Sequence, residues 1–128
     1  MNRFSPYAAV VLRLAVGLVF LHHGLMKLHN GIPATAEFMH SQGIPFATIG
    51  ATVVMGVETI GAACVLLGIL TRVWAAAMAF EMAIAGLLVV LPSGHWPELE
   101  GMLCAGALAL VALGDGPLSL AVRFKRVP

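Results

Sequence analysis

Three charged residues lie deep inside long apolar stretches of this sequence. Arg13, Glu58 and Glu81 are each surrounded by runs of Ala, Val, Leu, Gly and Met. An ionised group in the hydrocarbon core of a bilayer costs on the order of 3 kcal/mol or more, so each of these residues needs a partner or a function. At a helical rise of about 1.5 Å per residue, all three fall roughly 9 to 18 Å from the same membrane face. We therefore predict a buried charge cluster in which Arg13 pairs with Glu58 and Glu81 lies nearby.

The first apolar stretch carries its two cations on one helical face. At about 100° per residue, Arg13, Gly17, Phe20, Gly24 and Lys27 share a stripe, and the two glycines leave space along it. We expect this stripe to face inward. The buried charges then either form an ion pair that closes the structure or make a site that handles protons or binds a ligand, and both interpretations remain open.

A second polar group is predicted toward the opposite face. His23 and Lys27 end the first stretch, Glu100 begins the last, and Gly24 leaves room beside them. A pocket with apolar walls and a few placed polar groups is typical of small-molecule sites. We therefore predict that His23, Lys27 and Glu100 bind a ligand, whereas ordinary anchoring at the membrane interface remains an alternative for Glu100.

No metal site is predicted. His22 and His23 are adjacent, so their side chains diverge by about 100° on a helix. Cys64 and Cys104 each lie in the middle of an apolar stretch, without a C-x-x-C motif. Buried cysteines usually behave as small apolar residues, and a redox pair is the alternative.

Four apolar stretches must position these residues. They span residues 7–28, 49–70, 73–91 and 99–113, and Gly- and Pro-containing segments separate most of them. About 20 such residues cross a bilayer, and a backbone in lipid must satisfy its own hydrogen bonds, so each stretch is predicted to be a helix. Apolar residues make up 60% and charged residues 10% of the chain, against about 25% charged residues in soluble domains. We predict an all-α membrane protein, a single four-transmembrane-helix bundle over residues 1–128, with the fourth span the shortest.

The connections and charges predict an orientation. The segment Ala34–Gln42 is amphipathic and is expected on the membrane surface. With four spans, one side of the membrane holds Arg3, Arg72, Arg123, Lys125 and Arg126, whereas the other side holds only Lys27, at the end of a span. Positive residues favour the cytoplasmic side, so we expect a multi-pass protein of the cell (inner) membrane with both termini cytoplasmic.

Contacts with other molecules are expected mainly with lipid. A net charge of +1 gives no electrostatic reason to bind nucleic acid. Small residues recur every fourth position at Ala75, Ala79 and Ala83 and again at Gly101, Ala105 and Ala109. Such ridges let helices approach closely. They indicate either packing within the bundle or an interface between copies of the chain.

Several segments together resemble the DoxX family of small four-span membrane proteins. In Leu12–Leu28, an Arg and a Gly are followed by a second Gly with Lys-Leu three residues later. The segment Phe38–Pro45 is similar to the family's aromatic-to-Gly-x-Pro connection. The second span matches through Glu58, Gly61 and Gly68–Arg72, so the resemblance covers most of the chain.

The resemblance implies a quinone-linked redox role, because this family is usually associated with quinol oxidation, thiosulfate:quinone chemistry or oxidoreductase complexes active in oxidative stress. The cofactor would then be a quinone, with His23, Lys27 and Glu100 as its polar partners. No nucleotide or flavin fingerprint is present, so redox partner proteins are expected. Two other functions remain open, namely a non-enzymatic scaffold that recruits soluble redox proteins and a carrier of small molecules or ions.

Overall fold

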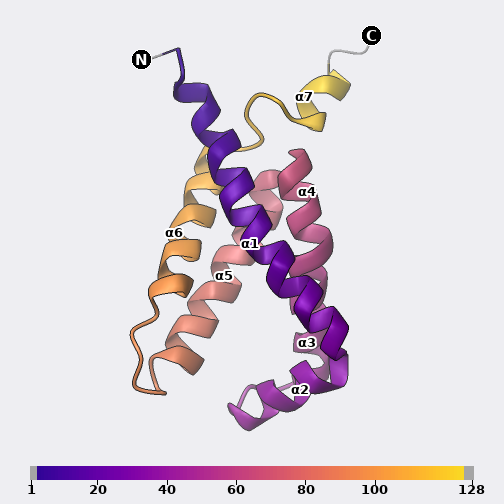
Figure 1. The fold of residues 1–128 in the computed structure, drawn as a ribbon, viewed down its shortest axis with the longest axis vertical. Helices are drawn as coiled ribbons and strands as arrows, with labels where there is room; N and C mark the ends of the chain where they lie inside the picture. Colours follow the sequence, from indigo (N-terminus) through magenta and orange to yellow (C-terminus); the bar gives the residue numbers. More distant parts are fainter. Residues whose placement is uncertain (1–2, 126–128) are drawn as a thin grey trace.

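The computed structural model describes residues 3–125, and all regular elements in this range are helical (Figure 1). A short 3₁₀ turn (Ser5–Tyr7) leads into α1 (Ala8–Asn30), and α2 (Ile32–Ser41) follows. The next helical rod consists of α3 (Ala47–Gly56), the π-helical segment η2 (Val57–Gly61) and α4 (Ala62–Leu67). Another rod joins α5 (Thr71–Ile84) to the π-helical segment η3 (Ala85–Val90), and α6 (Glu98–Leu113) and α7 (Leu120–Lys125) complete the described chain. The predicted all-α fold is confirmed.

Three of the helical rods are long and apolar enough to cross a membrane. They are Ser5–Asn30, Ala47–Leu67 and Thr71–Val90, which correspond to the first three predicted spans. The fourth predicted span corresponds to α6, which has 16 residues. Its length is about 24 Å, shorter than a typical hydrocarbon core of about 30 Å. The chain is therefore a membrane protein with multiple apolar helices, and a fourth crossing stays a prediction.

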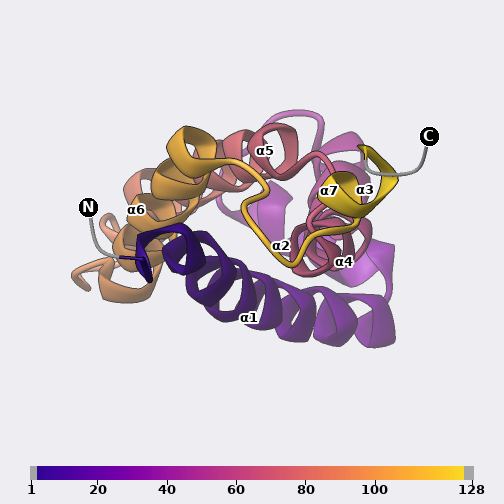
Figure 2. The same cartoon turned by 90° about the horizontal axis from the view of Figure 1, so that it is seen from above.

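The hydrophobic core lies where α1, α4, α5 and α6 meet. Its largest fully buried apolar side chains are Phe20, Met78, Leu110 and Val65. Figure 2 shows α1 running obliquely past the other helices, and α6 packs along α5. Many large apolar side chains outside this core remain exposed, as expected for helices that face lipid.

The small residues of the third predicted span contribute to packing within the chain. Ala75 and Ala79 are buried in the core. The Cys104 thiol of α6 lies 3.5 Å from the Ala79 carbonyl oxygen, and both Cys64 and Cys104 are free thiols. In contrast, Gly101 and Ala105 on α6 are exposed. The close approach of α5 and α6 thus explains part of the small-residue ridge.

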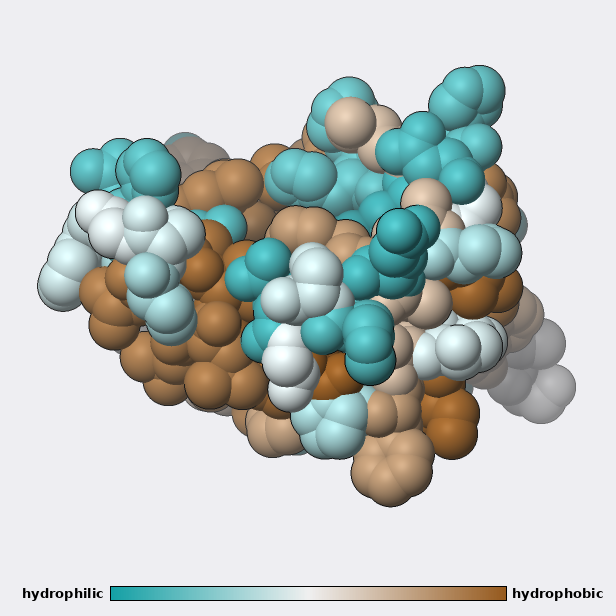
Figure 3. Space-filling model, turned by 90° about the horizontal axis from the view of Figure 1, so that it is seen from below, coloured by the Kyte–Doolittle hydropathy of each residue, from teal (hydrophilic) through white to brown (hydrophobic). Residues whose placement is uncertain are grey.

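The two ends of the molecule differ. The start of α1 and helix α7 lie at one end, whereas α2 and the α5–α6 connection lie at the other (Figure 1). The chain turns from α1 into α2 at Gly31, whose φ of 90° favours glycine. Helix α2 packs against α3, and hydrophilic and hydrophobic residues lie side by side on this end of the surface (Figure 3). The predicted amphipathic segment is therefore a helix that covers one end of the bundle.

Candidate functional site

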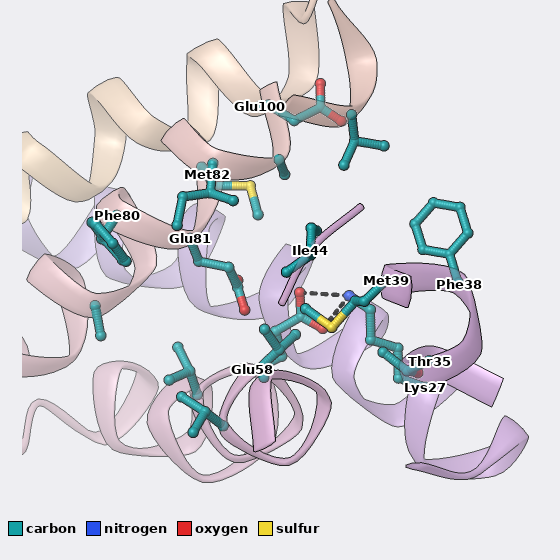
Figure 4. A pocket seen from close by; sticks show the side chains of 18 of the residues that line it. Lys27, Thr35, Phe38, Met39, Ile44, Glu58, Phe80, Glu81, Met82 and Glu100 are labelled. Atoms are coloured by element: carbon teal, nitrogen blue, oxygen red, sulfur yellow. Dashed lines mark hydrogen bonds and ion pairs between the residues drawn. The ribbon is translucent and has the colours of Figure 1, made fainter. Parts of the chain in front are cut away.

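A cavity of about 620 Å³ lies beneath α2, at the end of the molecule remote from α7. Side chains of α2, α3, α5 and both π-helical segments line most of it, and α1 and α6 contribute one residue each. Its walls are mainly aliphatic and aromatic. Its charged lining residues are Lys27, Glu58, Glu81 and Glu100 (Figure 4). The cavity is therefore apolar with a small charged cluster, which is the usual composition of a small-molecule site.

Lys27 and Glu58 form an ion pair in the cavity wall. The Lys27 ammonium donates to both carboxylate oxygens of Glu58, at 2.7 Å to Oε1 and 2.6 Å to Oε2. The Glu58 side chain is only 2% exposed, whereas that of Lys27 is 34% exposed. Lys27 thus neutralises a carboxylate that would otherwise be buried and unpaired.

Two local features bring this pair together. A Cβ added at Gly24 would lie 2.5 Å from the Glu58 carbonyl oxygen, so α1 approaches the second rod closely only because residue 24 has no side chain. Lys27 follows Gly24 by nearly one helical turn. Glu58 lies in η2, and single π-helical turns within α-helices are frequent at functional sites. The close approach at Gly24 and the π turn together position the Lys27–Glu58 pair.

Glu81 is the unpaired member of the cluster. Both of its carboxyl oxygens are buried, and neither has a hydrogen-bond partner. It interacts electrostatically with Glu58 and Lys27, and Figure 4 shows its side chain pointing from α5 toward them. One cation thus serves two neighbouring carboxyl groups. A buried polar group without a partner is costly, so its presence here calls for a ligand or a proton.

The predicted pairing of Arg13 with Glu58 is wrong. Arg13 is 2% exposed, and its five N–H groups donate to five backbone carbonyls instead. The acceptors are the carbonyl oxygens of Val65 and Leu66 at the end of α4 and of Asp115, Pro117 and Leu118 in the loop after α6, at 2.9 to 3.2 Å. The Val65 carbonyl also accepts from the backbone N–H of Gly68, whereas carbonyls at a helix end and in a Gly- and Pro-containing loop commonly lack regular partners. They accept from all five N–H groups of the guanidinium, and the Asp115 carboxylate interacts electrostatically with its charge.

Arg13 therefore belongs to a structural junction at the end of the molecule that carries α7. Its loop contacts are reinforced by Asp115, whose Oδ1 accepts a hydrogen bond of 3.0 Å from the backbone N–H of Thr71 at the start of α5. Sequence reasoning did not assign a role to Asp115. Its position in a Gly-Asp-Gly-Pro turn was the available signal, because Asp is common where a side chain must bond to a nearby backbone.

The predicted ligand-binding residues are only partly brought together. Lys27 and Glu100 line the cavity, but His23 is not among its lining residues. The His23 ring lies beside that of His22, with 5.8 Å between their centroids. Glu58 and Glu81 join Lys27 and Glu100 instead. The two predicted groups, one buried and one near the outer face, are thus largely one site.

The contribution of α2 to the cavity was missed from sequence. Thr35, Phe38 and Met39 line it from the side of α2. The apolar pair Phe38 and Met39 within a polar segment indicates that one face of this segment packs against another element. The sequence does not identify that element, which in the structure is α3.

Comparison with known proteins gives a consistent result. A family model described as DoxX matches residues 8–91. A Bacillus subtilis (strain 168) protein named "Putative oxidoreductase CatD" is 30% identical over 124 residues, which cover 94% of this chain and 89% of that protein. An "Uncharacterized membrane protein Rv3486" of Mycobacterium tuberculosis (strain ATCC 25618 / H37Rv) is 37% identical over 100 residues, covering 76% of this chain and 61% of the relative. No solved structure matches significantly. The family match covers every helix that lines the cavity except α6, and the chain belongs to the DoxX family.

Proposed function

We propose that this protein is a quinone-linked component of a membrane oxidoreductase and that the cavity beneath α2 holds the quinone ring. The observation that carries the proposal is an apolar cavity with a buried, unpaired carboxyl group, Glu81, beside the Lys27–Glu58 pair. The relative named "Putative oxidoreductase CatD" supports the redox assignment. A bound quinone would supply two-electron, two-proton redox chemistry.

The residues of the cavity fit such a ligand in three respects. The Lys27 ammonium has three N–H donors, so it can bond to a ring carbonyl while it remains paired with Glu58. A carboxylate without a cation is costly in apolar surroundings, so we expect Glu81 to carry a proton and donate it in a hydrogen bond. Aliphatic side chains such as Val53, Val57 and Ile84 would contact the isoprenoid tail and exclude water.

Electron exchange would require a second protein. The sequence carries no nucleotide or flavin fingerprint. We therefore propose that a redox partner protein exchanges electrons with the quinone, while this chain binds the ring and holds a proton at Glu81. A scaffold without a quinone, or a carrier of small molecules, would be the alternative role for the same bundle.

A short-chain quinone is expected to stabilise the purified protein. Ubiquinone-1 at roughly a hundredfold excess over its dissociation constant should add about 2.7 kcal/mol to the free energy of unfolding. The shift should be lost in Glu81→Leu, which removes the proposed donor without leaving a charge. His23→Ala should keep the full shift, because His23 does not line the cavity. Differential scanning fluorimetry in detergent measures all three.

The same experiment separates the alternatives. A quinone that shifts neither wild type nor variants would rule out the quinone site. Co-purification of soluble redox proteins would then favour the scaffold, and uptake into proteoliposomes would favour the carrier. Equal shifts in wild type and Glu81→Leu would place the quinone elsewhere on the protein.

We further propose that the protein resides in the inner membrane with both termini cytoplasmic and that α6 is a fourth crossing. The supporting observation is the gathering of Lys and Arg residues at the α7 end, including Arg72, Arg123 and Lys125. Reporter fusions at Gly31, Arg72, Gly94 and after the last residue should read outside, inside, outside and inside. Because α6 is short, the last two fusions are decisive, and the same reading from both would mean that α6 does not cross.

A further inference from the structure

We propose that the cavity beneath α2 also binds lipophilic organic cations and that such a cation displaces a proton from Glu81. This second activity does not depend on the quinone. It follows from the charges and the walls of the cavity.

The cavity has more acidic than basic groups. Among its lining residues, Lys27 is the cation, and both carboxylate oxygens of Glu58 already accept from it. Glu81 interacts with this cation electrostatically but without a hydrogen bond, and Glu100 has no further basic residue among the lining residues to pair with. Fully ionised, the site would thus hold two uncompensated negative charges. Because the rest of the wall is apolar, a ligand of positive charge would compensate this negative charge.

The walls suit a cation that carries apolar groups. Phe38 of α2 and Phe80 of α5 both line the cavity. Aromatic faces attract cations, more strongly where water is excluded. The volume of about 620 Å³ lies within the range of roughly 300 to 1,000 Å³ that is usual for small-molecule sites. A hydrated metal ion would gain little here, whereas an aryl or alkyl onium ion matches both the charge and the walls.

The exchange is balanced in atoms and charge. In the empty site, Glu81 is a neutral carboxylic acid. When the cation enters, the O–H bond of this acid breaks, the proton leaves to water, and the carboxylate pairs with the cation. The total charge of the cavity is the same before and after, so the exchange adds no uncompensated charge to the apolar surroundings.

The charged groups that face Glu81 come from three other elements. Lys27 of α1 and Glu58 of η2 interact with it directly, and Glu100 of α6 lines the same cavity. The lining residues of α2, α3 and η3 are uncharged. We therefore assign the displaced proton to Glu81. Glu58 is already paired with Lys27, and Glu100 lies farther than Glu81 from this pair (Figure 4).

Calorimetric titration of the protein in detergent tests the proposal. The probes are tetraphenylphosphonium and tetraphenylborate, which have the same shape and opposite charge. We expect the cation to bind and the anion not to bind. Titrations in buffers of different ionisation enthalpy should show about one proton released per cation. The affinity should rise with pH, on the order of tenfold per unit while Glu81 remains protonated in the free protein.

Two matched variants complete the experiment. Glu81→Gln should abolish the proton release and weaken cation binding by at least about tenfold, with a melting curve that verifies folding. Glu98→Gln should behave as wild type, because Glu98 is exposed and outside the cavity lining. Equal binding of both probes, no proton release, or unchanged binding by Glu81→Gln would overturn the proposal. Ubiquinone-1 assayed on the same samples shows separately whether the quinone assignment holds.

Discussion

Replacing Arg13 with methionine is expected to lower the free energy of unfolding by about 4 kcal/mol or more. The guanidinium donates to five backbone carbonyls, which join α4 to the loop after α6. Methionine fills a similar volume but removes a donor from all five acceptors, of which Val65 keeps a hydrogen bond from the Gly68 N–H. Arg13→Lys should be intermediate, because an ammonium has three donors in place of five. Denaturation in detergent, followed by circular dichroism, measures the loss.

Arg72 provides a matched control for this prediction. It is exposed and makes a single hydrogen bond, of 3.3 Å, to the Ala112 carbonyl. Arg72→Met should therefore change stability by no more than about 0.5 kcal/mol. Equal losses in Arg13→Met and Arg72→Met would mean that the junction at Arg13 does not hold the bundle together.

The helices and the inward face of α1 could be predicted from sequence because they depend on local patterns. Of the predicted stripe, Arg13, Gly17, Phe20 and Gly24 are buried as expected, whereas the Lys27 side chain is 34% exposed. Apolar periodicity and small residues report which side of a helix packs, and they do so without knowledge of its neighbours. The burial of Glu58 followed from the same reasoning.

The pairing of the charges could not be predicted from sequence because it depends on tertiary geometry. If the helices were straight and parallel, the depth of each residue in the membrane would place Arg13 nearer than Lys27 to Glu58. Figure 2 shows α1 running obliquely, and Gly24 lets the α2 end of this helix approach η2 closely. Arg13 found its partners in backbone carbonyls, which no residue pattern identifies. The cavity also needs α2 as a cover, and only the folded chain places α2 there.

Replacing Lys27 with methionine is expected to cost about 3 to 5 kcal/mol of stability, because it leaves the Glu58 carboxylate buried without its cation. Both Glu58 oxygens accept from the Lys27 ammonium, and the side chain of Glu58 is 2% exposed. Glu58→Gln should cost less, since the Lys27 side chain is 34% exposed and its ammonium can turn toward water. The double variant Lys27→Met/Glu58→Gln should recover part of the loss, because neither charge then remains unpaired.

The double-mutant cycle distinguishes this pair from its neighbours. Lys27→Met/Glu98→Gln should show no recovery, because Glu98 is exposed and not in contact with the pair. In Arg13→Met/Glu58→Gln the two losses of stability should add within about 0.5 kcal/mol, since Arg13 bonds to carbonyls at the α7 end of the molecule. Additive losses for Lys27→Met/Glu58→Gln would contradict the ion pair. If stability is recovered only in a triple variant, in which Glu81 is replaced together with Lys27→Met and Glu58→Gln, the Lys27 cation is shared between the two carboxyl groups.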